Sequence, residues 1–124
     1  MKALLLVAHG SREGDCARVM EKILEKVKSS GDIGLAEVAY VQFQRPTIEE
    51  AVRSLAGSGA KEIWAVPFFL FEGVHVKCDI PHQLKEAGSA YPDVRILLTR
   101  PLGYDEKLVD IIFERLAGEK ANIV

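Results

Sequence analysis

Apolar and polar positions form alternating blocks along the chain, and these blocks predict alternating strands and helices. Residues 3–8 are an unbroken apolar run, which is typical of a strand covered on both faces. Beyond it, apolar residues recur at the spacing of one face of an amphipathic helix. They are Cys16, Val19, Met20, Ile23, Leu24 and Val27. The turn residues 29–32, Ser-Ser-Gly-Asp, end this helix.

A second strand and helix follow. Residues 36–43 alternate between apolar and polar side chains, which predicts an edge strand. The next helix begins within residues 45–50, where Thr47 and Glu50 have the spacing of a capping box. The spacing of its apolar residues predicts which side chains it buries: Ile48, Ala51, Val52, Leu55 and Ala56.

The last two strand–helix pairs have weaker patterns. Residues 62–69 predict a third strand, the most apolar after the first, and residues 94–99 predict a fourth. The third helix is predicted to begin at residues 79–81, because Asp79 can cap it and Pro81 suits a first turn. A thin apolar face follows on Ile80, Leu84 and Ala87, and a final helix carries Leu108, Ile111, Ile112 and Leu116.

This alternation predicts an α/β fold with three layers, in which helices cover both faces of a mostly parallel four-stranded sheet. The length of 124 residues fits one domain over residues 1–124. The first and third strands are the most apolar and should be central, which favours the strand order 2-1-3-4. The chain reverses direction between these two strands, so a crevice is expected at their carboxyl ends.

Composition excludes several classes of protein. A net charge of −2 argues against binding nucleic acid through a basic surface. The longest apolar runs are far shorter than the roughly 20 residues of a membrane span, and the first residues do not fit a signal peptide. We therefore expect a cytoplasmic protein without membrane or nucleic-acid partners. Cys16 and Cys78 form no CxxC motif, so we expect two reduced thiols.

Two histidines are expected to meet at the crevice. His9 follows the first strand, and His75 lies in the segment 68–81 after the third. A single histidine at a strand end is commonly only a polar residue satisfied by the backbone, but a second one converging on the same place favours a site. Imidazole binds borderline metals and accepts protons near neutral pH. His82 is expected to lie further away.

The residues around this pair suit a flat anionic ligand. Gly10 is expected to allow a tight turn and Ser11 to cap the first helix, where free backbone N–H groups favour an anion. Cations lie after every strand at the same edge: Arg12, Arg45, Lys77 and Arg100. Phenylalanines near this edge can form an apolar floor: Phe43, Phe68, Phe69 and Phe71.

The segment 72–79 offers further donors. Glu72 is a candidate proton acceptor or weak ligand, whereas Cys78 is a poor candidate ligand. Glu72, His75 and Cys78 would share a face of a regular helix, but Gly73 argues against a helix here. Two histidines with one carboxylate leave a metal under-coordinated, which suits an ion that is held briefly and passed on.

Three stretches together resemble a known family: LLVAHGSR (5–12), VQFQRPTIEEAV (41–52) and VPFFLFEGVHVKCDIP (66–81). The chain is similar to the class II tetrapyrrole chelatases, in particular the small sirohydrochlorin cobaltochelatases of the CbiX type. The resemblance covers nearly the whole length and supports a chelatase-like fold. Each stretch alone is modestly specific, but their order and the chain length make the combination strong.

The resemblance implies an ATP-independent insertion of Co²⁺ into sirohydrochlorin, an octacarboxylate macrocycle, in cobalamin biosynthesis. It places the metal-binding and catalytic histidines at His9 and His75, with Glu72 as a further catalytic candidate. It also implies a homodimer of half-length chains, no permanent cofactor and no iron–sulfur cluster. The substrate-binding residues that we then expect are Ser11, Arg12, Phe43, Arg45, Phe69, Phe71, Gly73, Val74 and Lys77.

Other functions stay open at this stage. The same fold can insert nickel or iron, since one ligand type serves all three ions. A flavodoxin-like or receiver-like binding module is a second possibility, although receivers need acidic residues where His9 stands and a flavodoxin loop is richer in Ser, Thr and Gly. A histidine phosphatase would carry Arg-His-Gly after the first strand, whereas this chain has His-Gly-Ser-Arg.

Overall fold

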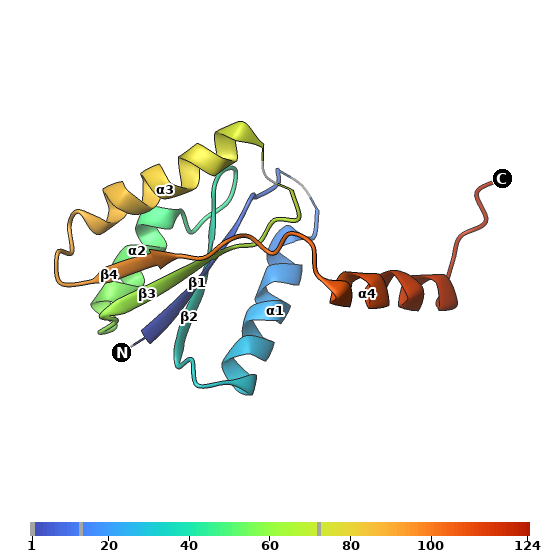
Figure 1. The fold of residues 1–124 in the computed structure, drawn as a ribbon, viewed down its shortest axis with the longest axis horizontal. Coiled ribbons are helices and arrows are strands. Elements are labelled where there is room, and N and C mark those ends of the chain that lie inside the picture. The colour runs from blue at the N-terminus through green and yellow to red at the C-terminus, as the bar shows by residue number, and fades with distance from the viewer. Residues whose placement is uncertain (1, 13, 72) are drawn as a thin grey trace.

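Four strands alternate with four helices along the chain (Figure 1). The computed structural model describes residues 2–12, 14–71 and 73–124. The elements are β1 (Lys2–Ala8), α1 (Cys16–Ser30), β2 (Leu35–Tyr40), α2 (Ile48–Gly57), β3 (Glu62–Pro67), α3 (Val74–Gly88), β4 (Arg95–Leu98) and α4 (Glu106–Ala117).

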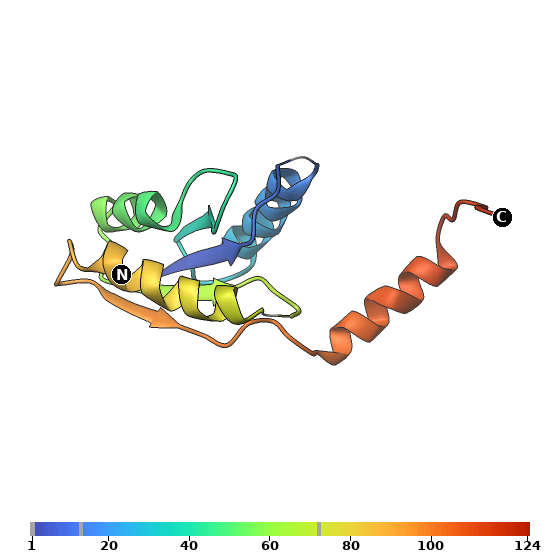
Figure 2. The same cartoon turned by 90° about the horizontal axis from the view of Figure 1, so that it is seen from above.

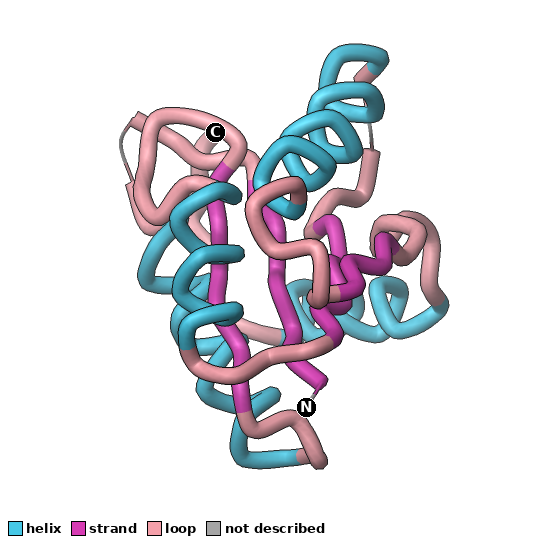
Figure 3. The backbone as a smooth tube through the Cα atoms, turned by 90° about the vertical axis from the view of Figure 1, so that its left-hand side faces the viewer, coloured by secondary structure: helices cyan, strands magenta, loops and turns pink. Residues whose placement is uncertain are grey.

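The four strands form one parallel sheet in the order β2-β1-β3-β4. This confirms the predicted fold class, strand order and position of β2 at an edge. Helices α2 and α3 cover one face of the sheet and α1 covers the other, so that helices lie on both sides of the strands (Figure 3). Among the described residues, none of the four helices combines the length and apolar character that a membrane span requires.

The central strand β1 supplies side chains to both layers, because successive residues of a strand point to opposite faces. Leu5 and Val7 are fully buried on the α2–α3 side, and Leu6 and Ala8 are buried on the α1 side. Burial of each large aliphatic side chain contributes about 1.5–3 kcal/mol to folding. The strand end that carries His9 is therefore anchored in the core from both faces.

Helix α2 begins as the sequence predicts. The Thr47 hydroxyl accepts a hydrogen bond from the Glu50 N–H at 3.2 Å, and the Glu50 carboxylate accepts one from the Thr47 N–H at 2.9 Å. Four of the five residues predicted for its buried face, Ile48, Ala51, Val52 and Leu55, lie in the core, whereas Ala56, near the end of the helix, is only partly buried.

Strand β2 is shorter than predicted, because it ends at Tyr40 and not at residue 43. Phe43 has a backbone φ of +66°, which a strand does not accommodate, and residues 41–46 form a turn. Strand β3 likewise ends at Pro67, before the predicted end at residue 69. The last residues predicted for both strands therefore lie in loops at the carboxyl edge.

The predicted start of α3 is wrong. The helix begins at Val74 and not near Asp79, with Gly73 as its N-cap and a hydrogen bond from the Lys77 N–H to the Gly73 carbonyl at 3.1 Å. Pro81 lies inside the helix, and it is exposed, so its ring does not disturb the buried face. The predicted face is confirmed, since Ile80, Leu84 and Ala87 are buried in the core. The two N-terminal turns were missed because Gly73 and Pro81 both read as helix breakers.

Helix α4 lies apart from the three layers, at the end of an extended segment that follows β4 (Figures 1 and 2). Within the helix, only Leu108 is even partly buried. Ile112, Phe113 and Leu116 are 59%, 63% and 62% exposed. The predicted apolar stripe is present, but it does not pack on the sheet of its own chain.

Candidate functional site at the carboxyl edge

The loops after β1, β2 and β3 meet at the carboxyl edge of the sheet. The Gln42 N–H donates to the His9 carbonyl at 3.1 Å, and the Phe68 N–H donates to the Val7 carbonyl at 2.8 Å. These backbone hydrogen bonds connect three segments that are remote in sequence. They place the loops together at the switch between β1 and β3, as the topology predicts.

The His9 side chain is exposed at this edge and is held from two sides. The Gln42 amide nitrogen lies 2.7 Å from His9 Nε2, and the Phe69 ring meets the imidazole edge-on with centroids 6.2 Å apart. In this arrangement the amide N–H donates to Nε2, which favours the neutral tautomer with its proton on Nδ1. The amide thus occupies the lone pair that a metal ion would take, so binding at Nε2 has to displace Gln42.

Gln42 was not among the predicted site residues. Its polar side chain in an otherwise apolar strand was interpreted as the exposed face of an edge strand. The early end of β2 turns it instead toward His9. A glutamine at the end of a parallel strand beside one that ends in histidine is the signal that could have identified it.

Replacing Gln42 with leucine is expected to change the tautomer of His9 without unfolding the protein, because Gln42 is exposed. Nitrogen NMR of the imidazole should show one dominant neutral tautomer in the wild type and a mixture in Gln42→Leu. Gln44→Leu is the matched control. The Gln44 side chain accepts a hydrogen bond from the Ser11 N–H, so its loss should leave the His9 tautomer unchanged. Identical His9 signals in wild type and Gln42→Leu would contradict this role.

Arg12 and Phe43 form a stacked pair close to His9. The Arg12 guanidinium carbon lies 4.5 Å from the centroid of the Phe43 ring, and both side chains are exposed. This contact combines a positive charge with an aromatic face. It supplies one part of the predicted apolar floor and one part of the predicted cationic rim.

Ser11 does not cap α1, contrary to the prediction. The helix begins at Cys16 with Asp15 at its N-cap position, because the chain takes four more residues to reach the first turn. The Ser11 N–H instead donates to Gln44 Oε1 at 2.7 Å, which ties the β1 loop to the β2 loop. The expected turn at Gly10 is confirmed by its φ of +95°.

Arg45 already has an anionic partner. Its Nε donates to Glu50 Oε1 at 3.1 Å, and its Nη2 also pairs with Glu50 Oε2. This hydrogen bonding, with that of the Thr47 N–H, lowers the pKa of Glu50 to about 2. Arg45 itself is exposed, so a ligand carboxylate at this position would compete with Glu50.

The segment between β3 and α3 exposes apolar side chains beside the site. Phe71 is 87% exposed and Val74 is 79% exposed, while Phe69 is half-buried against the core. Lys77 is exposed in the first turn of α3, whose N-cap is Gly73. The edge therefore presents apolar surface with a lysine next to it.

The predictions for Glu72 and for the side chain of His75 lie outside the described part of the structure. The backbone places His75 in the first turn of α3, a few residues after Phe69, which touches His9. Among the side chains that the structure describes, which exclude that of His75, no group of three His, Cys, Asp or Glu residues is placed to hold a metal ion. Cys16 and Cys78 are free thiols, as expected.

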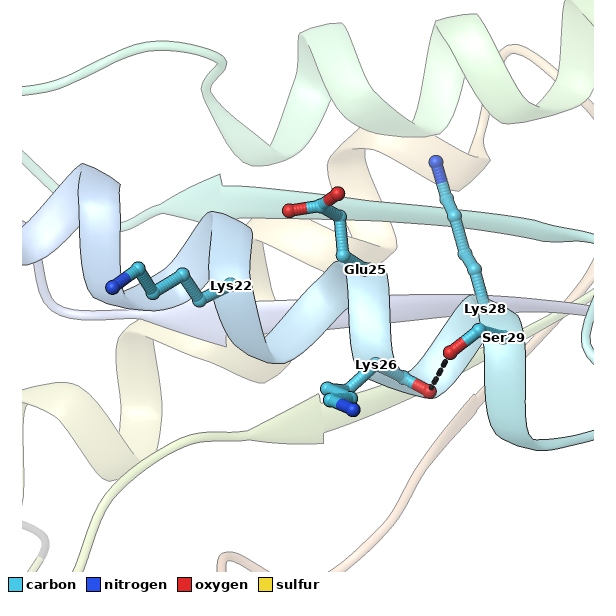
Figure 4. Close-up of a pocket in the computed structure, with 5 residues that line it drawn as sticks. All are labelled: Lys22, Glu25, Lys26, Lys28 and Ser29. Atoms are coloured by element: carbon cyan, nitrogen blue, oxygen red, sulfur yellow. Dashed lines mark hydrogen bonds between the residues drawn. The ribbon is translucent and has the colours of Figure 1, made fainter.

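A shallow hollow lies elsewhere, along the second half of α1 (Figure 4). Its lining comes from this one helix: Lys22, Glu25, Lys26, Lys28 and Ser29. Figure 4 shows the Ser29 hydroxyl donating to the Lys26 carbonyl, at 3.1 Å. Because α1 runs back from the carboxyl edge toward the amino edge, this hollow is separate from the His9 site.

In a comparison against known families, the CbiX family model matches residues 3–119. The chain belongs to the CbiX family. It is 35% identical to a sirohydrochlorin cobaltochelatase from Methanopyrus kandleri, with 94% of this chain and 95% of the relative covered. It is 36% identical to a sirohydrochlorin ferrochelatase from Priestia megaterium, with 94% of this chain covered but only 44% of the relative.

A solved structure shows the same fold. The sirohydrochlorin chelatase SirB from Bacillus subtilis subspecies spizizenii, in complex with cobalt, superposes with a TM-score of 0.85 at 34% identity. The match covers 94% of this chain and 50% of SirB. This CbiX-family chain therefore spans about half the length of SirB and of the Priestia relative, and nearly the full length of the Methanopyrus relative.

Proposed function

We propose that this chain is a sirohydrochlorin cobaltochelatase, which inserts Co²⁺ into sirohydrochlorin without ATP in cobalamin biosynthesis. The observation that carries the proposal is His9, exposed at the switch point and held by Gln42 and Phe69. The near full-length Methanopyrus relative with the name sirohydrochlorin cobaltochelatase supports it, and so does the cobalt complex of SirB. The protein acts as a single domain over residues 1–124.

In the proposed reaction one divalent ion enters the macrocycle and two pyrrole protons leave, so charge and atoms balance. His9 and His75 hold the incoming ion while it loses water, and imidazole suits this because its lone pair binds borderline metals weakly enough to release them. Glu72 or one of the histidines accepts the pyrrole protons as general base. Displacement of Gln42 from His9 Nε2 accompanies metal binding.

The macrocycle is proposed to lie on the apolar surface of the carboxyl edge. Phe43, Phe69, Phe71 and Val74 offer that surface, and Gly73 and Ser11 present backbone beside it. Sirohydrochlorin carries eight carboxylates, and Arg12, Arg45 and Lys77 are the proposed cations for them. Of these, Arg45 must first leave Glu50.

The protein is further proposed to work in the cytoplasm as a homodimer without a permanent cofactor. The half-length match to SirB and to the Priestia relative supports the dimer, because two copies supply the length of one such relative. Light scattering in solution tests it directly and should give twice the mass of the chain.

A second candidate is insertion of iron by the same site. The Priestia relative, a sirohydrochlorin ferrochelatase, is as similar in sequence as the cobaltochelatases. Histidine ligands accept cobalt, nickel and ferrous iron, whose affinities follow one common order.

The test is absorbance spectroscopy of sirohydrochlorin with purified protein and Co²⁺, Ni²⁺ or Fe²⁺, each without ATP. We expect cobalt insertion to be accelerated most over the protein-free reaction. Faster insertion of Fe²⁺ would establish the second candidate, and faster insertion of Ni²⁺ a nickel enzyme. No acceleration with any of the three ions would overturn the proposed function.

A further inference from the structure

Glu50 is held in place, whereas Arg45 is not. The Glu50 carboxylate accepts a hydrogen bond from the Thr47 N–H at 2.9 Å, and the Glu50 N–H donates to the Thr47 hydroxyl at 3.2 Å. This capping box fixes Glu50 in the first turn of α2, and its side chain is only 20% exposed. The Arg45 side chain, which precedes the helix, is 80% exposed. When the two separate, Arg45 is therefore the partner that moves.

Glu50 binds Arg45 as a ligand carboxylate would. The Arg45 Nε donates to Glu50 Oε1 at 3.1 Å, and Nη2 pairs with Oε2, so two guanidinium nitrogens bind both carboxylate oxygens. This bidentate contact is the geometry that arginine favours with carboxylates. Hydrogen bonding from Arg45 and Thr47 lowers the pKa of Glu50 to about 2, so the carboxylate is ionised at neutral pH. An anion-binding position at Arg45 is thus filled by the protein itself.

The turn that carries Arg45 belongs to the candidate site. Gln42 contacts the His9 imidazole from this turn. Gln44 accepts a hydrogen bond from the Ser11 N–H and so holds the turn against the β1 loop. Arg45 follows directly, so its backbone position at this edge is fixed while its side chain is exposed. Rotation of the side chain alone can therefore exchange the partner of the guanidinium.

We propose that Glu50 is an internal competitor that sets the affinity of the site for its anionic ligand. A carboxylate of the macrocycle binds Arg45 only after Arg45 leaves Glu50, so one ion pair replaces another and the net gain is small. Metal insertion does not alter the carboxylates, so the return of Arg45 to Glu50 favours release of the product to the same extent. This inference rests on the proposed function, because it takes the octacarboxylate macrocycle as the ligand.

The same competition makes the site less sensitive to small free anions. A carboxylate tethered near its partner acts as a local concentration in the millimolar range or above. A free anion at Arg45 then competes with Glu50 as well as with the macrocycle. It therefore lowers macrocycle binding by a smaller factor than it would without Glu50.

Glu50→Gln tests the competition, because it removes the charge while glutamine still serves in the capping box. Exposed ion pairs contribute little, so we expect the dissociation constant for sirohydrochlorin to fall by only about 2- to 5-fold. The KM for sirohydrochlorin should fall with it, and kcat should not rise. An unchanged or raised dissociation constant would overturn the proposal.

Glu49→Gln is the matched control. Glu49 is the neighbouring residue in the first turn of α2 and is exposed, and its replacement changes the net charge by the same amount. It leaves the pair of Arg45 and Glu50 intact and should keep the wild-type dissociation constant. Equal tightening in Glu49→Gln and Glu50→Gln would reveal a general effect of negative charge and would refute the competition.

Added citrate tests the response to free anions. It should weaken sirohydrochlorin binding by a larger factor in Glu50→Gln than in the wild type. An equal or smaller factor in the variant would contradict the proposed competition.

A double-mutant cycle tests whether Glu50 acts through Arg45. In an Arg45→Ala background, the further change Glu50→Gln should leave the dissociation constant unchanged, since no guanidinium remains to be released. A gain in affinity that persists without Arg45 would show that Glu50 acts in another way, against the proposal.

Chemical modification of the protein alone measures the release of Arg45 without any substrate. Phenylglyoxal reacts with free guanidinium groups, and peptide mass spectrometry gives the rate at each arginine. Arg45 should react faster in Glu50→Gln than in the wild type or in Glu49→Gln, with the exposed Arg53 as internal reference. The same rate in all three proteins would overturn the competition.

These measurements are separate from metal insertion. Tighter binding of sirohydrochlorin by Glu50→Gln, without insertion of any metal by the wild type, would count against the proposed function alone. Insertion of Co²⁺ with the same dissociation constant in the wild type and in Glu50→Gln would count against the internal competition alone.

Discussion

Cobalt insertion is expected to fall by about 100-fold or more when His75 is replaced by alanine, with binding of sirohydrochlorin largely retained. A group that holds the ion or takes a proton in the rate-limiting step contributes roughly 10²–10⁴-fold to a rate. The loss should appear in kcat, because His75 is proposed to contact the metal and not the carboxylates of the macrocycle. Steady-state absorbance measurements and a titration of sirohydrochlorin check the two parts separately.

His82→Ala is the matched control for this experiment. His82 is on the same helix, is 70% exposed and lies 3.4 Å from Glu86 through Nε2 and Oε1. It should keep near wild-type insertion. If His75→Ala retains activity, or if His82→Ala loses as much, the role proposed for His75 is wrong.

The second large effect is expected at Gly10, where alanine should lower the free energy of unfolding by roughly 2–5 kcal/mol. A φ of +95° costs an L-residue about 1–2 kcal/mol. In addition, a Cβ atom at Gly10 would lie 1.9 Å from the Gln42 carbonyl oxygen, so backbone must move, and overpacking of this kind costs about 1–3 kcal/mol. The displaced segment carries Gln42 and Phe43, so insertion should fall as well.

Gly14→Ala separates the two causes. Gly14 has a φ of +98°, nearly the same as Gly10, but a Cβ atom there would meet nothing within 4 Å. It should therefore cost only the conformational part, about 1–2 kcal/mol. Urea unfolding of both variants gives the difference. Equal destabilisation would mean that the close approach of the β1 and β2 loops is unimportant.

The strand order could be predicted because it depends on the apolar character of whole strands. The apolar run of residues 3–8 and the strong apolar character of 62–69 identify the central strands, whatever the exact ends of the elements. The capping box at Thr47 and Glu50 could also be predicted, because it depends only on two residues that are three positions apart. In both cases the physical determinant lies within a short stretch of sequence.

The missed features have determinants that no short stretch contains. The first turns of α3 form despite Gly73 and Pro81, because burial of Ile80, Leu84 and Ala87 fixes the helix against the core. The end of β2 depends on Phe43, whose φ is positive although its type favours strands. The contact between Gln42 and His9 depends on that early end.

Helix α4 shows a third kind of difficulty. Its apolar stripe was predicted, but periodicity says only that a helix needs a partner and not which surface provides it. In the segment between β4 and α4, the Leu102 and Gly103 N–H groups donate to the Pro67 and Phe69 carbonyls, and these two hydrogen bonds fix the direction in which the helix leaves. Those bonds join positions about 35 residues apart, beyond the reach of a local pattern.

Phe69 contacts both the proposed metal site and the segment that leads from β4 to α4. Its ring rests against the imidazole of His9, and its carbonyl accepts the Gly103 N–H. We therefore expect a displacement of this segment to be transmitted through the Phe69 peptide unit to the ring beside the His9 imidazole. For the proposed homodimer and the proposed metal site at His9, we therefore expect dimer formation and metal binding to be thermodynamically linked, and such linkage is reciprocal.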